Sequence, residues 1–171
     1  MLQMKIMKRI LLFFGLIAIA ASSCAQPQTK SKAAQGIPPY RILNTDSVYV
    51  TPADLKKNTP VLMIYFSPDC SHCQHLMYEL KPKMKDFKHV QVVMVTFVLQ
   101  LKAIQVFYRD FDLKKYPNFT VGTEGESYLV QRYFDVHMTP YIALYDKNHK
   151  LVKAWEKSPT ADELADEAKK L

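Results

Sequence analysis

The chain has 171 residues, of which 49% are hydrophobic, with a formal net charge of +7 but only three cysteines and four glycines. This composition is too apolar for a disordered chain, and three cysteines are too few for a scaffold built on disulfides. None of the glycines stands in a dinucleotide-binding or P-loop motif, which excludes those classes of nucleotide-binding protein. The lysines are scattered among acidic residues, which fits a solvated surface and argues against nucleic-acid binding.

The N-terminal segment is typical of an export signal. Residues 1–9 carry Lys5, Lys8 and Arg9, and residues 10–21 form an uninterrupted run of apolar residues and glycine. As a helix, such a run would rise about 18 Å, well short of a bilayer core of roughly 30 Å. We therefore predict a cleaved signal peptide rather than a membrane span.

The residues that follow resemble a bacterial lipobox, in which small residues precede a cysteine that is lipidated and becomes the new N-terminus. Ala21 departs from the pattern, which favours a larger aliphatic residue, but two serines and Cys24 follow it. The resemblance implies a lipoprotein signal peptide over 1–23 and a protein that faces the periplasm, anchored to the bacterial cell envelope by lipid on Cys24. The alternative is an ordinary signal peptide that leaves Cys24 as a free thiol. Residues 24–39, rich in Gln, Ser, Lys, Ala and Pro, predict a flexible tether to a single domain over 40–171.

The domain alternates apolar runs, which predict buried strands, with apolar residues at helical spacing, which predict helices with one buried side. Pro82 should kink or split the helix in which it falls. This order predicts a parallel pair of strands with helical crossovers and a closing antiparallel hairpin. In chain order the predicted elements are a β-prone stretch over 41–50, a helix start at 51–54, a strand over 61–66, a helix over 73–87, a strand over 90–99, helices over 101–111 and 127–134, strands over 140–145 and 151–155, and a C-terminal helix that begins with a capping box at 160–163.

The sequence Cys-Ser-His-Cys at positions 70–73 stands directly after an apolar strand and opens a helix. Cysteines at this spacing place the first thiol at the helix N-terminus and the second one turn inside. Backbone N–H groups and the positive end of the helix dipole stabilise a thiolate there, so we predict Cys70 as the nucleophile and Cys73 as the resolving thiol. A cationic His72 would lower the pKa of Cys70 further, whereas the charge of Asp69 would raise it.

Together with residues 139–145, this motif resembles the thioredoxin superfamily over residues 40–171. The resemblance implies an α/β, three-layer fold with a central mixed sheet flanked by helices, and a helical insertion between the central strand and a cis-proline. It also implies that Pro140 is that proline and that the backbone of Thr139 pairs with the substrate. The chain is most similar to exported thiol–disulfide oxidoreductases of the TlpA/ResA kind, whose insertion would lie within residues 101–134.

Several residues depart from the family pattern. Asp69 takes the place of the usual aromatic residue before the first cysteine. Ile64 and Leu76 stand where thioredoxins and TlpA/ResA proteins, respectively, carry acids that help deprotonate the resolving cysteine. His72, in the third motif position, resembles the oxidising members of the superfamily. The direction of electron flow is therefore open.

We predict an extracytoplasmic thiol–disulfide oxidoreductase that exchanges electrons with protein or peptide substrates through Cys70 and Cys73 and needs no cofactor. Its partners would be protein thiols and disulfides, an upstream redox protein and, through lipid on Cys24, a membrane. Two alternatives stay open: a copper- or zinc-binding domain in which His137 beside Met138 supplies a distant ligand, and a thioredoxin fold that only docks a partner. Three aromatic residues suggest an apolar rim for the substrate: Tyr65, Phe66 and Tyr141.

Overall fold

A computed structural model of the chain describes residues 36–171. The predicted signal peptide over 1–23, Cys24 and the tether as far as residue 35 lie outside the described residues. The described part contains, in chain order, β1 (Ile42–Asn44), β2 (Tyr49–Val50), the 3₁₀ turn η2 (Pro52–Asp54), β3 (Val61–Phe66), α2 (Ser71–Leu80), the 3₁₀ segment η3 (Lys81–Phe87), β4 (Gln91–Thr96), α3 (Leu101–Asp110), η4 (Leu113–Lys115), β5 (Phe119–Thr123), η5 (Gly125–Ser127), α4 (Leu129–Phe134), β6 (Tyr141–Tyr145), β7 (Leu151–Trp155) and α5 (Ala161–Lys169). In this part of the chain, every helix is too short or too polar to cross a membrane.

The seven strands form one mixed sheet in the order β2-β1-β5-β4-β3-β6-β7. β4 is parallel to both β3 and β5, whereas β6 is antiparallel to both β3 and β7. All six residues of β3 are buried, because a strand in the middle of a sheet that is covered on both faces meets no water. The sheet confirms the predicted parallel pair, the closing hairpin and the α/β class.

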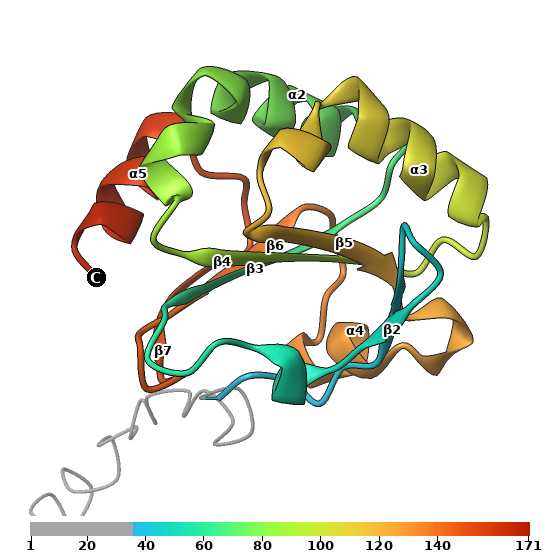
Figure 1. Cartoon of the computed structure of the whole chain (residues 1–171), viewed down its shortest axis with the longest axis horizontal. Helices are drawn as coiled ribbons and strands as arrows, with labels where there is room; N and C mark the ends of the chain where they lie inside the picture. The colour runs from blue at the N-terminus through green and yellow to red at the C-terminus, as the bar shows by residue number, and fades with distance from the viewer. Residues whose placement is uncertain (1–35) are drawn as a thin grey trace, which may run out of the picture. The chain divides into compact units, whose positions relative to one another are not determined.

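Helices cover both faces of the sheet (Figure 1). α2, α3 and α5 lie over one face, and α4 lies over the other. The side chains of β3 alternate between the two layers, as strand geometry requires. Ile64 and Phe66 pack in the apolar cluster with α2, α3 and α5, which we call the α2 face. Met63 and Tyr65 pack in the second cluster with α4, which we call the α4 face. This is the three-layer arrangement that the sequence predicts.

Two predicted helices are interrupted or shortened. Pro82 splits the helix over 73–87: α2 ends before the proline and the chain continues as η3, because a proline inside a helix removes a donor and clashes with the preceding turn. At the start predicted over 51–54, the N–H and hydroxyl groups of Thr51 both donate to the Asp54 carboxylate. The helix nevertheless stops after a single 3₁₀ turn.

β5 is a strand that the sequence analysis misses. It lies between the helices predicted over 101–111 and 127–134 and pairs with β4. A glycine inside a strand weakens the local signal, because it has low strand propensity and no side chain to pack. Gly122 is needed here, since a Cβ at this position would lie 2.7 Å from the carbonyl oxygen of Leu43 in β1. The close approach of β1 therefore requires a glycine at position 122, and this glycine weakens the strand signal in the sequence.

Candidate active site

Cys70 is the N-cap of α2, at the end of the turn that follows β3. Its N–H donates to the Ser67 carbonyl oxygen at 3.1 Å, and the side-chain amide of Gln74 donates to the Pro68 carbonyl oxygen at 2.8 Å. These bonds fix the turn against the first turn of the helix. Cys70 is a free cysteine. It is half-buried, so part of its surface stays in contact with solvent.

Burial and hydrogen bonds act on the Cys70 thiol in opposite directions. Burial raises its pKa, but hydrogen bonds with the Thr139 side chain, the Cys73 thiol and the backbone N–H groups of Cys73 and His72 outweigh burial and leave the pKa below the ordinary value. The N–H groups are free to do so because the first turn of a helix leaves its donors unpaired.

Cys73 lies one helical turn further along α2 and is only 2% exposed. Ile64 of β3 and Leu76 of α2 belong to the same buried cluster on the α2 face. Burial in these surroundings raises the pKa of Cys73 to about 12. Apolar residues at the two positions where related proteins carry acids therefore keep the second thiol protonated, and the two cysteines differ in acidity.

The loop before β6 lies against the first cysteine. The peptide bond between Thr139 and Pro140 is cis, and the Cys70 thiol donates to the Thr139 carbonyl oxygen at 3.4 Å. Tyr65 in β3 pairs with Tyr141 in β6, so the residues that follow β3 meet the residues that precede β6. The topology thus brings together two predicted segments that lie far apart in the sequence.

A cavity of about 760 Å³ opens beside this contact. His72, Thr139 and Pro140, all predicted site residues, line the side nearest Cys70. Phe97 and Met138 add apolar surface, with exposures of 37% and 67%. The site therefore combines a sulfur of lowered pKa with an open, partly apolar groove.

The floor of the cavity is polar. Tyr65 lines it and is itself buried, and its hydroxyl donates to the Glu124 carboxylate at 2.9 Å. At the start of α4, Glu124 also accepts the backbone N–H groups of Val130 at 2.7 Å and Gln131 at 3.4 Å. Glu124 is the one acidic side chain that is buried among the described residues. Its donors compensate the cost of burying a carboxylate.

The aromatic residues expected to form an apolar rim are distributed differently. Tyr65 lines the cavity floor, but Phe66 is buried on the α2 face because neighbouring residues of a strand point to opposite sides. Tyr141 lines a second, smaller cavity next to the first. Sequence reasoning missed the contribution of Phe97, which follows β4 and carries no signal that separates it from a core phenylalanine.

The histidine predicted as a distant metal ligand has another partner. His137 is exposed and pairs with Asp135. Within residues 36–171, no group of three or more His, Cys, Asp or Glu side chains is arranged to hold a metal ion. The metal-binding alternative therefore has no ligand cluster in this part of the chain.

A cysteine pair that begins a helix after a central strand, with a cis-proline loop against it, defines a thioredoxin-fold protein. The chain belongs to the thioredoxin-like domain family, whose sequence model matches residues 53–171. No curated protein gives a significant sequence match.

Solved structures have the same fold. A secreted Mycobacterium tuberculosis disulfide oxidoreductase, described as homologous to E. coli DsbE, matches with a TM-score of 0.66 and 17% identity over 82% of this chain and 99% of its own. The exposed lipoprotein thioredoxin of Streptococcus pneumoniae matches with a TM-score of 0.61 and 20% identity over 78% and 99%. A thiol-disulfide oxidoreductase from Bacteroides fragilis matches with a TM-score of 0.63 and 14% identity over 77% and 98%. At these identities the likeness establishes the fold.

Proposed function

We propose that the protein is a thiol–disulfide oxidoreductase that exchanges electrons with protein or peptide substrates through Cys70 and Cys73. The observation that carries this proposal is the difference in acidity between the two thiols. The pKa of Cys70 is lowered at a half-buried helix start, whereas burial raises the pKa of Cys73 to about 12. Stepwise exchange requires one thiolate that attacks and one thiol that is held in reserve.

In the reducing direction, the Cys70 thiolate attacks one sulfur of a substrate disulfide. A mixed disulfide forms between Cys70 and the substrate, and the other substrate sulfur leaves as a thiolate that takes up a proton. Cys73 then loses its proton and attacks the Cys70 sulfur. The Cys70–Cys73 disulfide closes, and the second substrate sulfur is released as a thiol. The substrate is reduced and the cysteine pair is oxidised.

In the oxidising direction the same steps run in reverse. A substrate thiolate attacks the Cys70 sulfur of the oxidised pair, Cys73 leaves and takes up a proton, and a second substrate thiolate then displaces Cys70. An upstream redox protein would restore the starting state in either direction. The exchange needs no cofactor, because sulfur carries the electrons.

Thr139 and Pro140 are the proposed contacts for the substrate backbone. Their loop already presents the Thr139 carbonyl oxygen to the Cys70 thiol, so a polypeptide that delivers a cysteine to this sulfur must pass the loop. His72, on the cavity wall, is proposed to stabilise the thiolate when it is cationic. The adjacent cavity would accommodate substrate side chains on either side of that cysteine.

The direct test is insulin reduction and dithiol-peptide oxidation by the full-length protein. Cys70→Ser should abolish exchange in both assays. Cys73→Ser should instead accumulate a mixed disulfide that survives electrophoresis without reductant. Cys24→Ala is the matched control and should keep its activity, because this cysteine stands outside the motif. Unchanged turnover by Cys70→Ser would contradict the mechanism.

We further propose that the protein is exported and lipid-anchored at Cys24. The basic start, the apolar run over 10–21 and the small residues before the cysteine support this location. A solved structure of the same fold is itself described as an exposed lipoprotein. Radiolabelled palmitate should be incorporated by the full-length chain in a bacterial host and lost in Cys24→Ala. Label on both proteins, or on neither, would contradict lipid attachment at this residue.

A further inference from the structure

The outer wall of the cavity is the short connection between β7 and α5. Residues 156–160 make this connection, and Glu156, Lys157 and Ser158 line the cavity. These three residues are exposed, and only Pro159 of the connection is buried. The position of the wall therefore depends on how the two ends of the connection are held.

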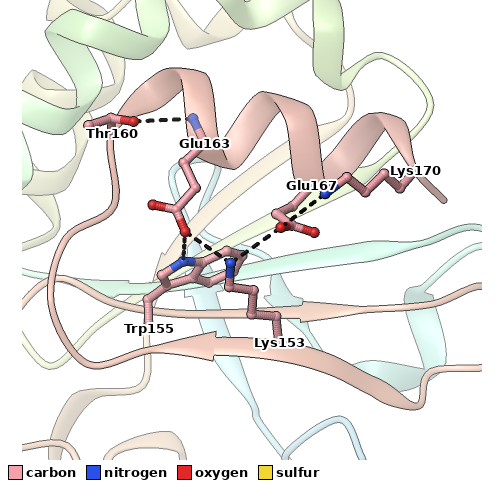
Figure 2. Close-up of polar contacts among 6 residues, drawn as sticks. All are labelled: Lys153, Trp155, Thr160, Glu163, Glu167 and Lys170. Atoms are coloured by element: carbon pink, nitrogen blue, oxygen red, sulfur yellow. Dashed lines mark hydrogen bonds and ion pairs between the residues drawn. The ribbon is translucent and has the colours of Figure 1, made fainter.

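Glu163 holds both ends of this connection (Figure 2). At the start of the connection, the indole N–H of Trp155 donates to Glu163 Oε1 at 2.8 Å. At its end, the backbone N–H of Glu163 donates to the Thr160 hydroxyl oxygen at 3.2 Å. Glu163 thus contacts the residue immediately before the connection and the last residue within it.

The orientation of the Glu163 carboxylate departs from the capping box that the sequence predicts. A glutamate in this position normally returns to the N–H group of the N-cap, here Thr160. Instead its Oε1 accepts from Trp155 and, at 2.9 Å, from Lys153, whose ammonium also lies 4.8 Å above the indole ring. Trp155 is 8% exposed, and a buried indole N–H needs an acceptor. The carboxylate is diverted from the cap to supply it.

The wall is also connected to the Thr139–Pro140 loop through the sheet. Trp155 pairs with Ile142 in β6, and Ile142 is the second residue after Pro140. The width of the cavity between the wall and the Thr139–Pro140 loop therefore depends on where β7 ends, and the bond from Trp155 to Glu163 anchors that end.

We propose that Glu163 is a positioning residue for the substrate, which holds residues 156–158 at the distance that admits the polypeptide flanking a substrate cysteine. This inference rests on the proposed function but concerns docking rather than sulfur chemistry. The side chain of Glu163 bonds to Trp155 and Lys153 and not to either cysteine. Its loss should weaken the docking of a polypeptide and leave the attack of Cys70 on a small disulfide intact.

The test uses the full-length reduced protein with two disulfides: insulin, which needs the groove, and dithiobis(nitrobenzoic acid), which needs only the sulfur. Glu163→Ala removes the acceptor and keeps the backbone bond to Thr160. Glu163→Gln keeps an oxygen for the indole. Glu167→Ala is the matched control, because Glu167 pairs with Lys153 and Lys170 in the same cluster without contacting the tryptophan (Figure 2).

For Glu163→Ala, we expect the insulin concentration that gives half the limiting rate to rise about three- to tenfold, while the limiting rate and the rate with the small disulfide stay within about twofold. Glu163→Gln should restore most of the affinity, and Glu167→Ala should match the unsubstituted protein. The emission of Trp155, the single tryptophan, should shift in Glu163→Ala but not in Glu167→Ala.

Insulin kinetics in Glu163→Ala equal to those of the unsubstituted protein would overturn this inference. So would an equal loss with both disulfides, since that pattern indicates a defect of the fold rather than of docking. An unsubstituted protein that reacts with neither disulfide would instead overturn the proposed function.

Discussion

The two faces of the central sheet hold ionisable groups in opposite ways. On the α2 face, Cys73 lies among apolar side chains, and burial raises its pKa to about 12. On the α4 face, Glu124 is also buried but accepts hydrogen bonds from Tyr65, Val130 and Gln131. The two faces therefore accommodate a buried ionisable group differently: Cys73 lies among apolar side chains, whereas three hydrogen-bond donors surround the Glu124 carboxylate.

The same contrast separates the two cysteines of the motif. Cys70 stands at the N-cap of α2, where unpaired N–H groups and the Thr139 side chain stabilise its thiolate. Cys73 also has hydrogen bonds from the Ser67 backbone and the Thr139 side chain, but burial on the apolar α2 face outweighs them and raises its pKa. One helical turn therefore separates a thiol of lowered pKa from a thiol of raised pKa, which is the asymmetry that the proposed exchange needs.

Removal of the buried carboxylate should cause the largest loss of stability. Glu124→Ala leaves the Tyr65 hydroxyl and two backbone N–H groups without their acceptor, so we expect the free energy of unfolding to fall by about 3–5 kcal/mol. Glu124→Gln keeps an acceptor and should cost about half as much. Urea denaturation of the reduced protein measures both. A Glu124→Ala protein as stable as the unsubstituted one would contradict the role given to these bonds.

Removal of one donor to Glu124, the Tyr65 hydroxyl, should cause a smaller loss of stability. Tyr65→Phe deletes the hydroxyl and leaves Glu124 with its two backbone donors, so we expect a loss of about 1–2 kcal/mol. The expected order of stability is therefore the unsubstituted protein, then Tyr65→Phe, then Glu124→Ala. Urea denaturation gives this order, and a Tyr65→Phe protein less stable than Glu124→Ala would contradict it.

On the α2 face, substitution of Cys73 should cause the smallest loss of stability. Cys73→Ala should lower the stability of the reduced protein by about 1 kcal/mol, because a buried thiol behaves as a small apolar group. Cys73→Ser, although closer in shape, should cost roughly 1 kcal/mol more than Cys73→Ala, since its hydroxyl must be buried. Thermal unfolding of the two proteins compares them directly. Equal stabilities would contradict this expectation and indicate that the hydrogen-bond partners of the Cys73 thiol, Ser67, Cys70 and Thr139, satisfy the serine hydroxyl as well.

Local signals in the sequence were enough to predict one half of the site. An apolar strand followed by a helix start places Cys70 and Cys73 without reference to any distant residue. The fold class and the parallel pair follow from the same alternation. The approach of Thr139 and Pro140 to Cys70 needed the family resemblance, because nothing between residues 73 and 139 shows which strands pair.

The polar floor and the outer wall could not be predicted from the sequence, because both depend on tertiary contacts. Glu124 and Glu126 stand two residues apart in a turn, yet the first is buried and the second is exposed. Glu124 is held by the Tyr65 hydroxyl of β3 and by backbone N–H groups at the start of α4, which the local sequence does not reveal. Likewise, Glu163 carries the pattern of a capping box, and the indole of Trp155, on another element, changes what its carboxylate contacts.

The difference in acidity between the two thiols can be measured through the pH dependence of their alkylation. Reduced Cys24→Ala protein would be treated with iodoacetamide, and mass spectrometry would follow Cys70 and Cys73 separately. Only thiolates react, so a lowered pKa should bring Cys70 to half its maximal rate at a pH below that of an ordinary thiol, about 8.5.

Cys73 should stay unreactive through neutral pH and gain reactivity only toward its pKa of about 12. In urea, both cysteines should return to the ordinary value. Two distinct midpoints in the folded protein, with Cys70 below the ordinary thiol and Cys73 above it, are the predicted result. A single midpoint shared by both cysteines in the folded protein would contradict the account.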